Sequence, residues 1–578
     1  MIFHPFMKQN AQNLFKETLE HFSERITTLS NTYLETTRLN ITIERVKQFI
    51  SCIIFKLSFG LNNSNVHTVL TSPYLSDLNS YISKFTGKFP GGSTLIRRIP
   101  QIENSLSNLL NKLIEDVQDY FYCELGNQAR NAMENQRKNS LKSVSPPIEC
   151  FIGLMPPSKM FPTLNVYQRG ELVPFFNALM YEGVKRISST AELIGILKEP
   201  EWQGDTCIFR LAGTLGFLEG TPGKYKFYEN FKWIERLLGD FDTFLNQQLT
   251  ALHVLDLTVT SVDSSNMPMD QRDKTGSQGT GSRGTFFGHK SSIGVDSKCL
   301  PITQELGTGR VHDTVLFPDT LDVIYDLSVS TEQEMWIVEA DAGYSGSSII
   351  DSITHLEVVP IVDLNPKNST RLKALKKASN DLKKYSKKAV MEGLSKSERR
   401  AWVEEIKSIS EQSPHPFTYD EKCEILRKVM RKYTEKAKRY GLSYNEQRTE
   451  KKLRKLVMDL RRELRLYGTS DEKKKGLLLF AFGTIEWQLI YAIRGQNEGI
   501  NGIVKKRGNV IGDGQDTSWI QRDKSVKNRL NACITLMKAR SLVYFLVTGQ
   551  TTHSLRVYYN WHIKNKSFLL MFIVIFCR

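Results

Sequence analysis

Residues 255–263 read LDLTVTSVD, and apolar side chains occupy nearly every second position of this stretch. A period of two is typical of a β-strand, because successive side chains point to opposite faces of a sheet. The sequence before it, such as YENFKWIERLLGDFDTFLNQQL (228–249), repeats apolar residues every three or four positions, which predicts helix. The change of period near residue 255 therefore marks the start of a β-containing core.

The same alternation returns several times after this first strand. Strand-like runs are TFFGHKSSIGVD (285–296), LPITQELGTG (300–309), MWIVEAD (335–341) and VVPIVDLN (358–365), with SQGTGSRG (277–284) as a connector. A helical pattern occupies 315–327, between the third and fourth runs, and a short helix precedes the fifth. Three hairpin-linked strands followed by alternation predict an α/β fold, a mixed sheet with helices on its faces. In such a sheet the first and fourth strands are expected neighbours.

Length and composition support several folded regions. The chain has 578 residues, enough for about three or four domains, and 40% of them are hydrophobic, which argues against wholesale disorder. We expect a helical region that could bind DNA ends at 1–145 and a second helical region at 150–250. The core follows in two parts, 251–366 and 476–540, with a basic helical insertion at 367–475 between them. An apolar tail occupies 541–578.

The net charge of +16 is concentrated in one region. Residues 367–475 hold 32 Lys and Arg against 16 Asp and Glu, whereas the rest of the chain holds 46 of each. Such a block is a candidate electrostatic footprint for nucleic acid, and the alternative is a charged, solvated helix pair. Its segments at 423–440 and 451–467 read as long helices that we expect to pair as an antiparallel hairpin. If the insertion clamps DNA, binding should weaken steeply with salt.

Cysteines and chain ends indicate a cytoplasmic protein. The eight cysteines are scattered and form no Cys-x-x-Cys pair, which argues against a zinc site or a disulfide framework. The N-terminus lacks the features of a signal peptide. The apolar run at 568–577 spans ten residues, well short of the roughly 18–20 that cross a bilayer. We therefore expect no membrane association.

Two aspartates close predicted strands. Asp263 ends the first strand and Asp341 ends the fourth. If these strands are neighbours, both carboxylates emerge at one edge of the sheet. A single strand-end aspartate is usually a turn former or a cap, so the argument depends on the pair.

A third acid lies in YAIRGQNEGINGIVK (491–505), which holds Tyr491, Arg494, Glu498 and Lys505. On a helix turning about 100° per residue, these four side chains would share one narrow face. That face could bind a phosphate and a metal ion, or it could be a solvated face with ordinary ion pairs. Three glycines within the stretch disfavour a continuous helix.

Three carboxylates without sulfur or imidazole suit Mg²⁺ or Mn²⁺. If Asp263, Asp341 and Glu498 converge, they could hold two such ions, which activate a water or a 3′-hydroxyl for displacement at phosphorus. Together with the basic block, these carboxylates point to polynucleotide chemistry.

These motifs resemble those of DDE transposases of prokaryotic insertion sequences. Tyr491, Arg494, Glu498 and Lys505 match the subgroup signature Tyr-x2-Arg-x3-Glu-x6-Lys. VDSSNMPM and DAGYSG resemble the motifs of the first and second aspartate. FGHKSSIGVDSKCLPI (287–302) and GRVHD (309–313), which contains His312 and Asp313, resemble the region of the second and third strands. The similarity is strongest over about 250–365 and 476–510.

The resemblance implies a ribonuclease H-like core and a complete set of functional residues. Asp263, Asp341 and Glu498 would be the catalytic metal ligands for two Mg²⁺ or Mn²⁺ ions, and Tyr491, Arg494 and Lys505 would bind DNA. The implied partners are the double-stranded terminal repeats and target DNA, handled by a dimer on two ends in the prokaryotic cytoplasm near the nucleoid. Residues 1–145 lack a clear match to the family, and we assign them to recognition of the terminal repeats. The insertion departs from the small β domain found in some members, because it reads as charged helix.

The implied activity is cleavage at the element's ends followed by attack of a 3′-hydroxyl on target DNA. A ribonuclease H-like nuclease without strand transfer is a second interpretation. A non-catalytic DNA-binding protein descended from a transposase is a third.

Overall fold

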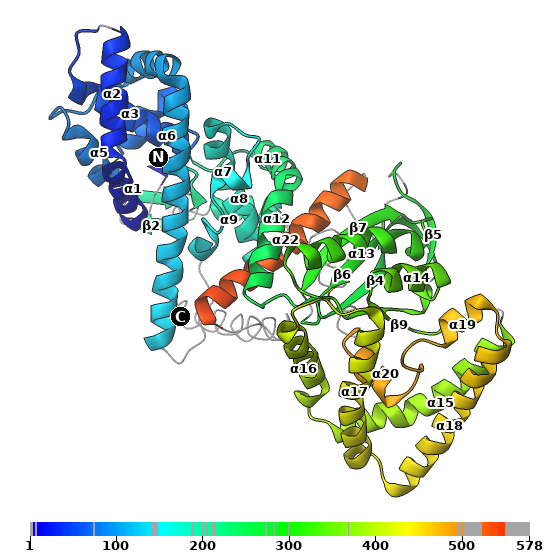
Figure 1. Ribbon diagram of the computed structural model, residues 1–578. Helices are drawn as coiled ribbons and strands as arrows, with labels where there is room; N and C mark the ends of the chain where they lie inside the picture. The colour runs from blue at the N-terminus through cyan, green and yellow to red at the C-terminus, as the bar shows by residue number, and fades with distance from the viewer. Residues whose placement is uncertain are drawn as a thin grey trace, which may run out of the picture. The chain divides into compact units, whose positions relative to one another are not determined.

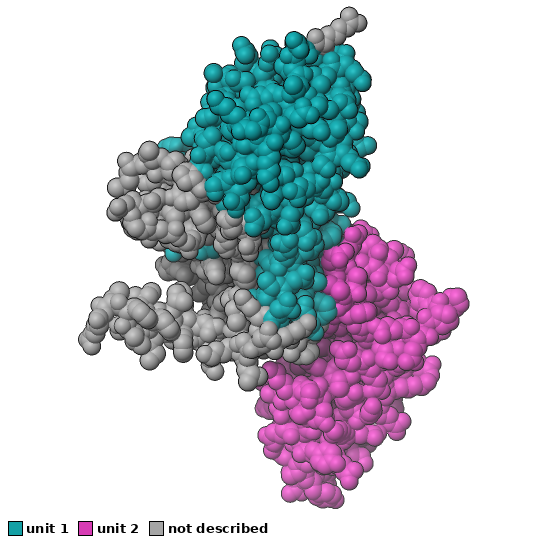
Figure 2. All heavy atoms as spheres, turned by 90° about the vertical axis from the view of Figure 1, so that its left-hand side faces the viewer, with its two compact units in different colours: residues 1–245, 539–551 teal, residues 246–538, 552–578 magenta. Residues whose placement is uncertain are grey.

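The computed structural model confirms a mixed α/β architecture (Figure 1). The residues that it describes are 4–5, 9–37, 39–72, 75–139, 148–185, 190–198, 201–203, 206–209, 212, 215–218, 220–269, 271, 274–281, 284–298, 300–367, 369–494, 500 and 523–549. The chain divides into two compact units, residues 1–245 with 539–551 and residues 246–538 with 552–578 (Figure 2).

The first unit is built mainly from helices. They are α1 (Gln9–His21), α2 (Ser23–Thr37), α3 (Ile43–Ser58), α4 (Asn63–Leu70), α5 (Ser76–Ser83), α6 (Gly92–Asn139), α7 (Pro157–Met160), α8 (Val166–Lys185), α9 (Thr190–Leu197) and α11 (Lys224–Leu237), followed by α12 (Gly239–Ala251) at the boundary. Phe15, Phe55 and Phe121 meet edge to face, with ring centroids 5.2–5.5 Å apart. These rings join α1, α3 and α6 into one core.

Two features of this unit differ from the sequence expectations. The region 150–250 includes β2 (Glu201–Gln203) and β3 (Thr206–Phe209), which form a three-stranded sheet with β1 (His4–Pro5). These strands are too short to show a period of two. In addition, α6 runs for 48 residues through Pro100, although a proline in a helix interior usually breaks or kinks the helix.

The second unit contains the six-stranded sheet. Its strands are β4 (Val259–Pro268), β5 (Ser277–Gly281), β6 (Gly284–Val295), β7 (Pro301–Thr308), β8 (Ile337–Ala340) and β9 (Val359–Val362). The order is β5-β6-β4-β8-β9, with β7 also paired to β6. β4, β8 and β9 are parallel, and the remaining pairs are antiparallel. The predicted pairing of the first and fourth strands is confirmed, but the Gly-rich connector contains an additional strand, β5.

Helices cover both faces of this sheet. Gly294 faces α13 (Asp313–Ser330), since a Cβ at this glycine would lie 2.5 Å from Ile324. The next residue back, Ile293, packs in a core with Leu530 and Ile534 of α22 (Asp523–Thr548). Because consecutive strand residues point to opposite faces, α13 and the first half of α22 lie on opposite faces.

Within the described residues, α22 is the one helix long and apolar enough to cross a membrane. Its segment Val526–Val547 is 72% buried in the protein, and its first half packs against the sheet. A buried core helix has this same composition, so the helix is weak evidence for a membrane span. The apolar run at 568–577 lies outside the described residues.

The insertion is helical, as expected, but its packing differs from the prediction. It comprises α15 (Thr370–Gly393), α16 (Glu398–Gln412), α17 (Tyr419–Gly441), α18 (Tyr444–Tyr467) and α19 (Ser470–Gly476). The predicted α17–α18 hairpin is wrong, because each of these helices packs mainly against α15, and they diverge from their shared corner (Figure 1). Their apolar residues bury against a third helix instead of one another.

The ends of α15 and α17 are in backbone contact. A Cβ at Gly393 would lie 2.2 Å from the carbonyl oxygen of Ala437, and one at Gly441 would lie 2.4 Å from that of Ala389. Gly393→Ala is therefore expected to destabilise the protein by about 1–3 kcal/mol, since the helices must separate. Chemical denaturation monitored by tryptophan fluorescence measures this loss. Gly239→Ala, at an open site, is the control, and an equal effect of both changes would contradict the close approach.

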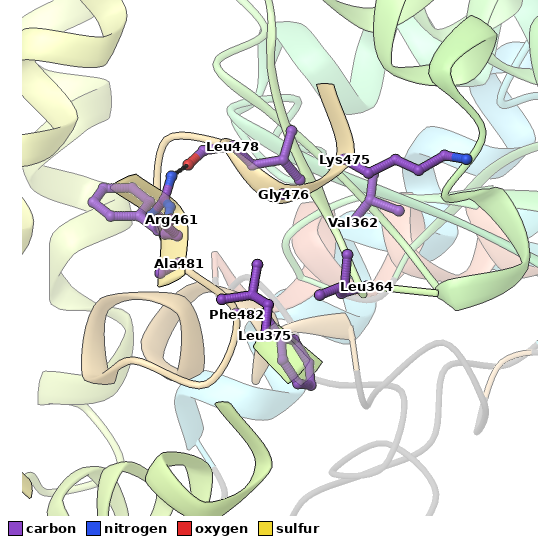
Figure 3. Close-up of a pocket in the computed structure, with 10 residues that line it drawn as sticks. Val362, Leu364, Leu375, Arg461, Lys475, Gly476, Leu478, Ala481 and Phe482 are labelled. Carbon is purple, nitrogen blue, oxygen red and sulfur yellow. Dashed lines mark hydrogen bonds between the residues drawn. The ribbon is translucent and has the colours of Figure 1, made fainter. Parts of the chain in front are cut away.

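A small cavity marks where the insertion meets the sheet (Figure 3). Its lining combines Val362 and Leu364 at the end of β9, Leu375 of α15 and Arg461 of α18 with the segment 475–482. The space open to the centre of a water molecule is about 10 Å³, enough for about one water. Arg461 donates a hydrogen bond to the carbonyl oxygen of Leu478 at 2.5 Å. The insertion is thus packed directly onto the edge of the sheet that carries the candidate site.

Candidate active site beside three parallel strands

Three aspartates lie at equivalent positions on adjacent strands. Val262 of β4 pairs with Ala340 of β8, and Ala340 pairs in turn with Val362 of β9. The next residue along the chain is Asp263, Asp341 and Asp363 respectively. Asp341 and Asp363 directly follow their strands, as predicted for Asp341. The prediction that the first strand ends at Asp263 is wrong, because β4 continues to Pro268 by pairing with β6. Residues that are level across paired strands share a face of the sheet. Asp263 pairs with Ile293, which places this acidic row on the face covered by α22 and opposite α13.

Arg494 connects the two predicted catalytic aspartates. Its Nη2 donates to Asp263 Oδ1 at 3.1 Å and lies 3.7 Å from Asp341 Oδ2. Burial lowers the pKa of Arg494, but the neighbouring Tyr491, Asp263 and Asp341 outweigh it, so the pKa is raised overall. The guanidinium remains charged and holds both carboxylates on one cation. The structure therefore brings Asp263, Asp341 and Arg494 together.

Tyr491 is fixed by an aromatic stack. Thr484 caps α20 (Ile485–Tyr491) by accepting the Trp487 N–H, and the Trp487 ring stacks on Tyr491 with centroids 4.1 Å apart. Arg494 Nη1 donates to the Tyr491 phenol oxygen at 2.8 Å. Burial raises the pKa of Tyr491, so the phenol stays protonated and retains a proton to donate.

The predicted shared helix face is only partly realised. α20 ends at Tyr491, and Arg494 lies in the turns that follow, so no regular helix connects them. Their side chains nevertheless meet, since residues three apart in such turns remain neighbours. Glu498 and Lys505 lie outside the described residues. The convergence of Glu498 with the two aspartates stays a prediction.

Asp363 is a member of the site that the sequence reasoning missed. Its carboxylate accepts from Lys376 Nζ of α15 at 2.5 Å, and this ammonium also lies 3.9 Å from the centroid of the Phe482 ring. The signal is present in the sequence, because VVPIVD ends in an aspartate as TSVD and VEAD do. The ion pair with Lys376 indicates that Asp363 anchors the insertion to the site.

Glu339 is a second missed acid. It lies on β8 two residues before Asp341, is fully buried, and neither carboxyl oxygen has a hydrogen-bond partner among the described residues. Burial raises its pKa well above the usual 4.5, against a smaller opposing effect from the charge of Arg494 and its nearby backbone N–H. That N–H favours the ionised form but falls short of a full hydrogen bond.

This raised pKa makes stability depend on pH in a defined direction. The folded chain retains the Glu339 proton above 4.5, where the unfolded chain releases it. The resulting stabilisation is complete below 4.5 and is lost as the pH rises through the folded-state pKa. Glu339→Gln, which cannot ionise, should therefore melt at a temperature that rises relative to wild type between pH 5 and 8. A melting-temperature difference that stays constant over this range would contradict the prediction.

His312 and Asp313 have structural contacts. His312 is the N-cap of α13, where its Nδ1 accepts the Thr314 N–H at 3.3 Å. Asp313 is paired with Lys290 of β6 at 3.2 Å. These interactions cap the first turn of α13 and attach it to β6.

The donor set fits a hard divalent cation. Asp263 Oδ1 and Asp341 Oδ2 lie 3.1 Å and 3.7 Å from the same nitrogen of Arg494. The distance between these two carboxylate oxygens therefore cannot exceed the sum of those two distances. Carboxylate oxygens are the ligands that Mg²⁺ and Mn²⁺ prefer. Within the described part of the chain, no three His, Cys, Asp or Glu side chains form a group able to hold a metal ion. The predicted third ligand, Glu498, falls outside that part.

Comparison with known proteins defines the class of domain. Residues 255–440 match the family model of the transposase DDE domain. No curated protein sequence matches the chain. The matched region begins just before β4, contains Asp263, Asp341 and Asp363, and ends in α17. This match supports a DDE transposase and therefore a nucleic-acid-processing enzyme with DNA as its partner, and the six-stranded mixed sheet flanked by helices is consistent with that fold.

Proposed function

We propose that this protein is a transposase with a ribonuclease H-like core that cleaves DNA at the ends of a prokaryotic insertion sequence and joins the 3′-hydroxyl to target DNA. The observation that carries this proposal is the pair of carboxylates, Asp263 and Asp341, which follow the paired residues Val262 and Ala340 of two parallel strands and face one arginine. The match of residues 255–440 to the transposase DDE domain supports it independently.

In this proposal Asp263, Asp341 and Glu498 hold two Mg²⁺ or Mn²⁺ ions. DDE transposases generally use divalent metals. Such ions lower the pKa of the attacking water or hydroxyl and neutralise charge on the leaving oxygen. The carboxylates would supply the negative charge that retains such ions. Helix α20, which precedes Glu498 in the sequence, packs against β9.

Tyr491, Arg494 and Lys505 bind phosphates of the element end. The Arg494 guanidinium presents several donors in a planar fork, which suits phosphate oxygens. One donor of this fork would bind a phosphate oxygen while Nη1 remains on Tyr491. The Tyr491 phenol donates its own proton to a phosphate oxygen. Positioning and charge stabilisation are the main protein contributions to phosphoryl transfer.

The remaining assignments follow from the need to handle two DNA ends. A dimer binds the two double-stranded terminal repeats and the target, and residues 1–145 recognise the repeats. The protein acts in the prokaryotic cytoplasm at the nucleoid. Sedimentation of the protein with terminal-repeat duplexes tests the dimer directly.

The deciding experiment uses the purified full chain, a labelled duplex carrying the ends of the element that encodes it, a target plasmid, and Mg²⁺ or Mn²⁺. Joined products are the expected result. Nicked products without joining would identify a nuclease. DNA binding without any cleavage in either metal would favour a non-catalytic descendant of a transposase and would overturn the proposal.

A further inference from the structure

Helix α15 has one side made of lysines. At about 100° per residue, Lys373, Lys377, Lys384 and Lys387 fall within an arc of about 80°, and all four are exposed. We call these four residues the lysine face. The opposite side of α15 is buried in the core through residues such as Leu375 and Leu382. The helix is therefore held by its apolar side while its lysine face is open to solvent.

The lysine face has little internal charge compensation. Within the described residues, Lys373, Lys377 and Lys387 have no ion pair, and Lys384 has only a long contact of 3.9 Å with the exposed Asp381. Lys373 and Lys377 are four residues apart, and Lys384 and Lys387 are three apart. Each such like-charge pair destabilises a helix by roughly 0.2–0.5 kcal/mol. Repulsion between these lysines therefore destabilises the helix, and an anion bound against them would relieve that repulsion.

Helix α17 in the same insertion shows the contrasting arrangement. Four of its exposed cations each face a carboxylate: Lys428 with Glu424, Arg431 with Glu435, Lys432 with Glu405 and Lys436 with Glu398. Arg427 and Arg439, also exposed, have no ion pair among the described residues. The excess of positive charge is therefore not spread evenly over the insertion. Among the described residues it is uncompensated on the lysine face of α15, next to the sheet, and also on α18, whose exposed cations without an ion pair are Arg448, Lys451, Lys452, Lys455, Arg462 and Arg465. Of these two helices, α15 is the one whose lysines adjoin the candidate site.

The lysine face is continuous with the candidate active site. Lys376, adjacent to Lys377, is paired with Asp363 at the end of β9. Lys383, adjacent to Lys384, lies 5.3 Å from the centroid of Trp487, whose ring stacks on Tyr491. Two neighbours of the lysine face thus contact the site itself. A polyanion bound along α15 would reach the acidic row without leaving the positive surface.

We propose that the lysine face of α15 binds the phosphate backbone of duplex DNA as that DNA enters the active site. The inference rests on the proposed function and adds the path of the substrate. The helix extends about 21 Å from Lys373 to Lys387, which matches the rise of about six base pairs. Lysines act as point charges on phosphates without reading bases, so the contact is independent of sequence.

The chemistry of α15 favours DNA over a lipid surface. Membrane-surface helices expose an apolar face to the acyl chains, whereas the apolar side of α15 is buried within the protein. Met391, four residues beyond the lysine face, is the large hydrophobic residue that α15 exposes among those described. Between Lys373 and Lys387 the exposed side of α15 therefore carries cations and no large apolar side chain, which suits a hydrated polyanion.

The test compares two variants that remove the same charge at different places. One replaces the lysine face (Lys373→Gln, Lys377→Gln, Lys384→Gln and Lys387→Gln). The other replaces the compensated cations of α17 (Lys428→Gln, Arg431→Gln, Lys432→Gln and Lys436→Gln). The affinity of each full-length protein for an element-end duplex and for an unrelated duplex is measured from 50 to 300 mM salt. Far-UV circular dichroism and melting establish that both variants fold.

Removing one lysine from a DNA phosphate lowers the slope of log affinity against log salt by about one. The slope of the lysine-face variant should therefore fall by about three to four on both duplexes, and that of the α17 variant by less than about one. Equal reductions in the two variants, or an unchanged slope in the lysine-face variant, would overturn the proposal. A reduced slope on the element-end duplex alone would also overturn it, because binding to phosphates is sequence-independent.

Failure of this inference is distinguishable from failure of the proposed function. Asp263→Asn should bind DNA with the wild-type salt slope but not cleave it. The lysine-face variant should cleave at saturating DNA and low salt. If the wild-type protein binds DNA through the lysine face yet forms no cleaved product, the DNA path stands and the transposase chemistry does not.

Discussion

Asp341→Asn is expected to abolish both cleavage and joining of DNA while the protein stays folded. Asp341 Oδ1 accepts the Gly343 N–H at 2.7 Å, and an asparagine oxygen can accept the same hydrogen bond. The change therefore removes a negative charge without removing the local turn. Transition-state stabilisation by metal ions is worth several kcal/mol, and each 1.36 kcal/mol is a factor of ten. We expect a loss of at least about 10³-fold in the rate of product formation.

The rate is measured under single-turnover conditions with a prenicked and an intact element-end duplex. Asp351→Asn is the matched control, since Asp351 is an exposed acid of α14 (Ser347–His355) paired with Lys474 and not in the acidic row. It should retain wild-type rates. An Asp341→Asn protein that cleaves within tenfold of wild type would show that Asp341 is no metal ligand. Unchanged DNA affinity in the same protein confirms that the defect is chemical.

Arg494→Lys is the second change expected to have a large effect, although it keeps the charge. Two different nitrogens of Arg494 contact Tyr491 and the aspartate pair. A single ammonium nitrogen cannot reproduce this fork. Loss of one positioned donor at a transition state typically reduces the rate by roughly 10²–10³-fold. We expect a fall of that size in the cleavage rate, with a smaller change in DNA affinity.

Arg462→Lys, at an exposed position on α18, is the control and should behave as wild type. Arg494→Ala should be no less defective than Arg494→Lys, because neither side chain provides the fork. Full activity in Arg494→Lys would show that only the charge at this position matters. The two outcomes separate a geometric role from a purely electrostatic one.

Much of the sheet could be predicted from local sequence. The alternation in LDLTVTSVD and the apolar run MWIVEAD indicate strands by themselves, and their parallel pairing follows from the order of strands and helices. The strand β5 within 277–284 could not be predicted, because glycine-rich sequence carries no alternation and the strand forms by pairing with β6. Periodicity indicates the insertion's helices but not their partners, because α17 and α18 could have buried their apolar sides on each other as well as on α15.

The candidate site was predictable where a motif contains its residues. Asp263, Asp341, Tyr491 and Arg494 belong to such motifs, and the structure brings these four side chains together. Asp363 and Glu339 do not, because an aspartate after a strand is usually a turn former and a glutamate within a strand has no distinguishing pattern. Their relation to Asp341 depends on strand register, which links residues far apart in the chain.

The sequence by itself determined the period of each element, the location of the excess positive charge and the chemical types of the predicted site residues. These properties are local, since they depend on side chains a few positions apart. Only the tertiary structure decided that three aspartates on adjacent parallel strands are level with one another, that Arg494 contacts two of them, and that the lysine face borders the stack on Tyr491. Long-range pairing and the burial of α15 set these contacts, and no short window of sequence contains that information.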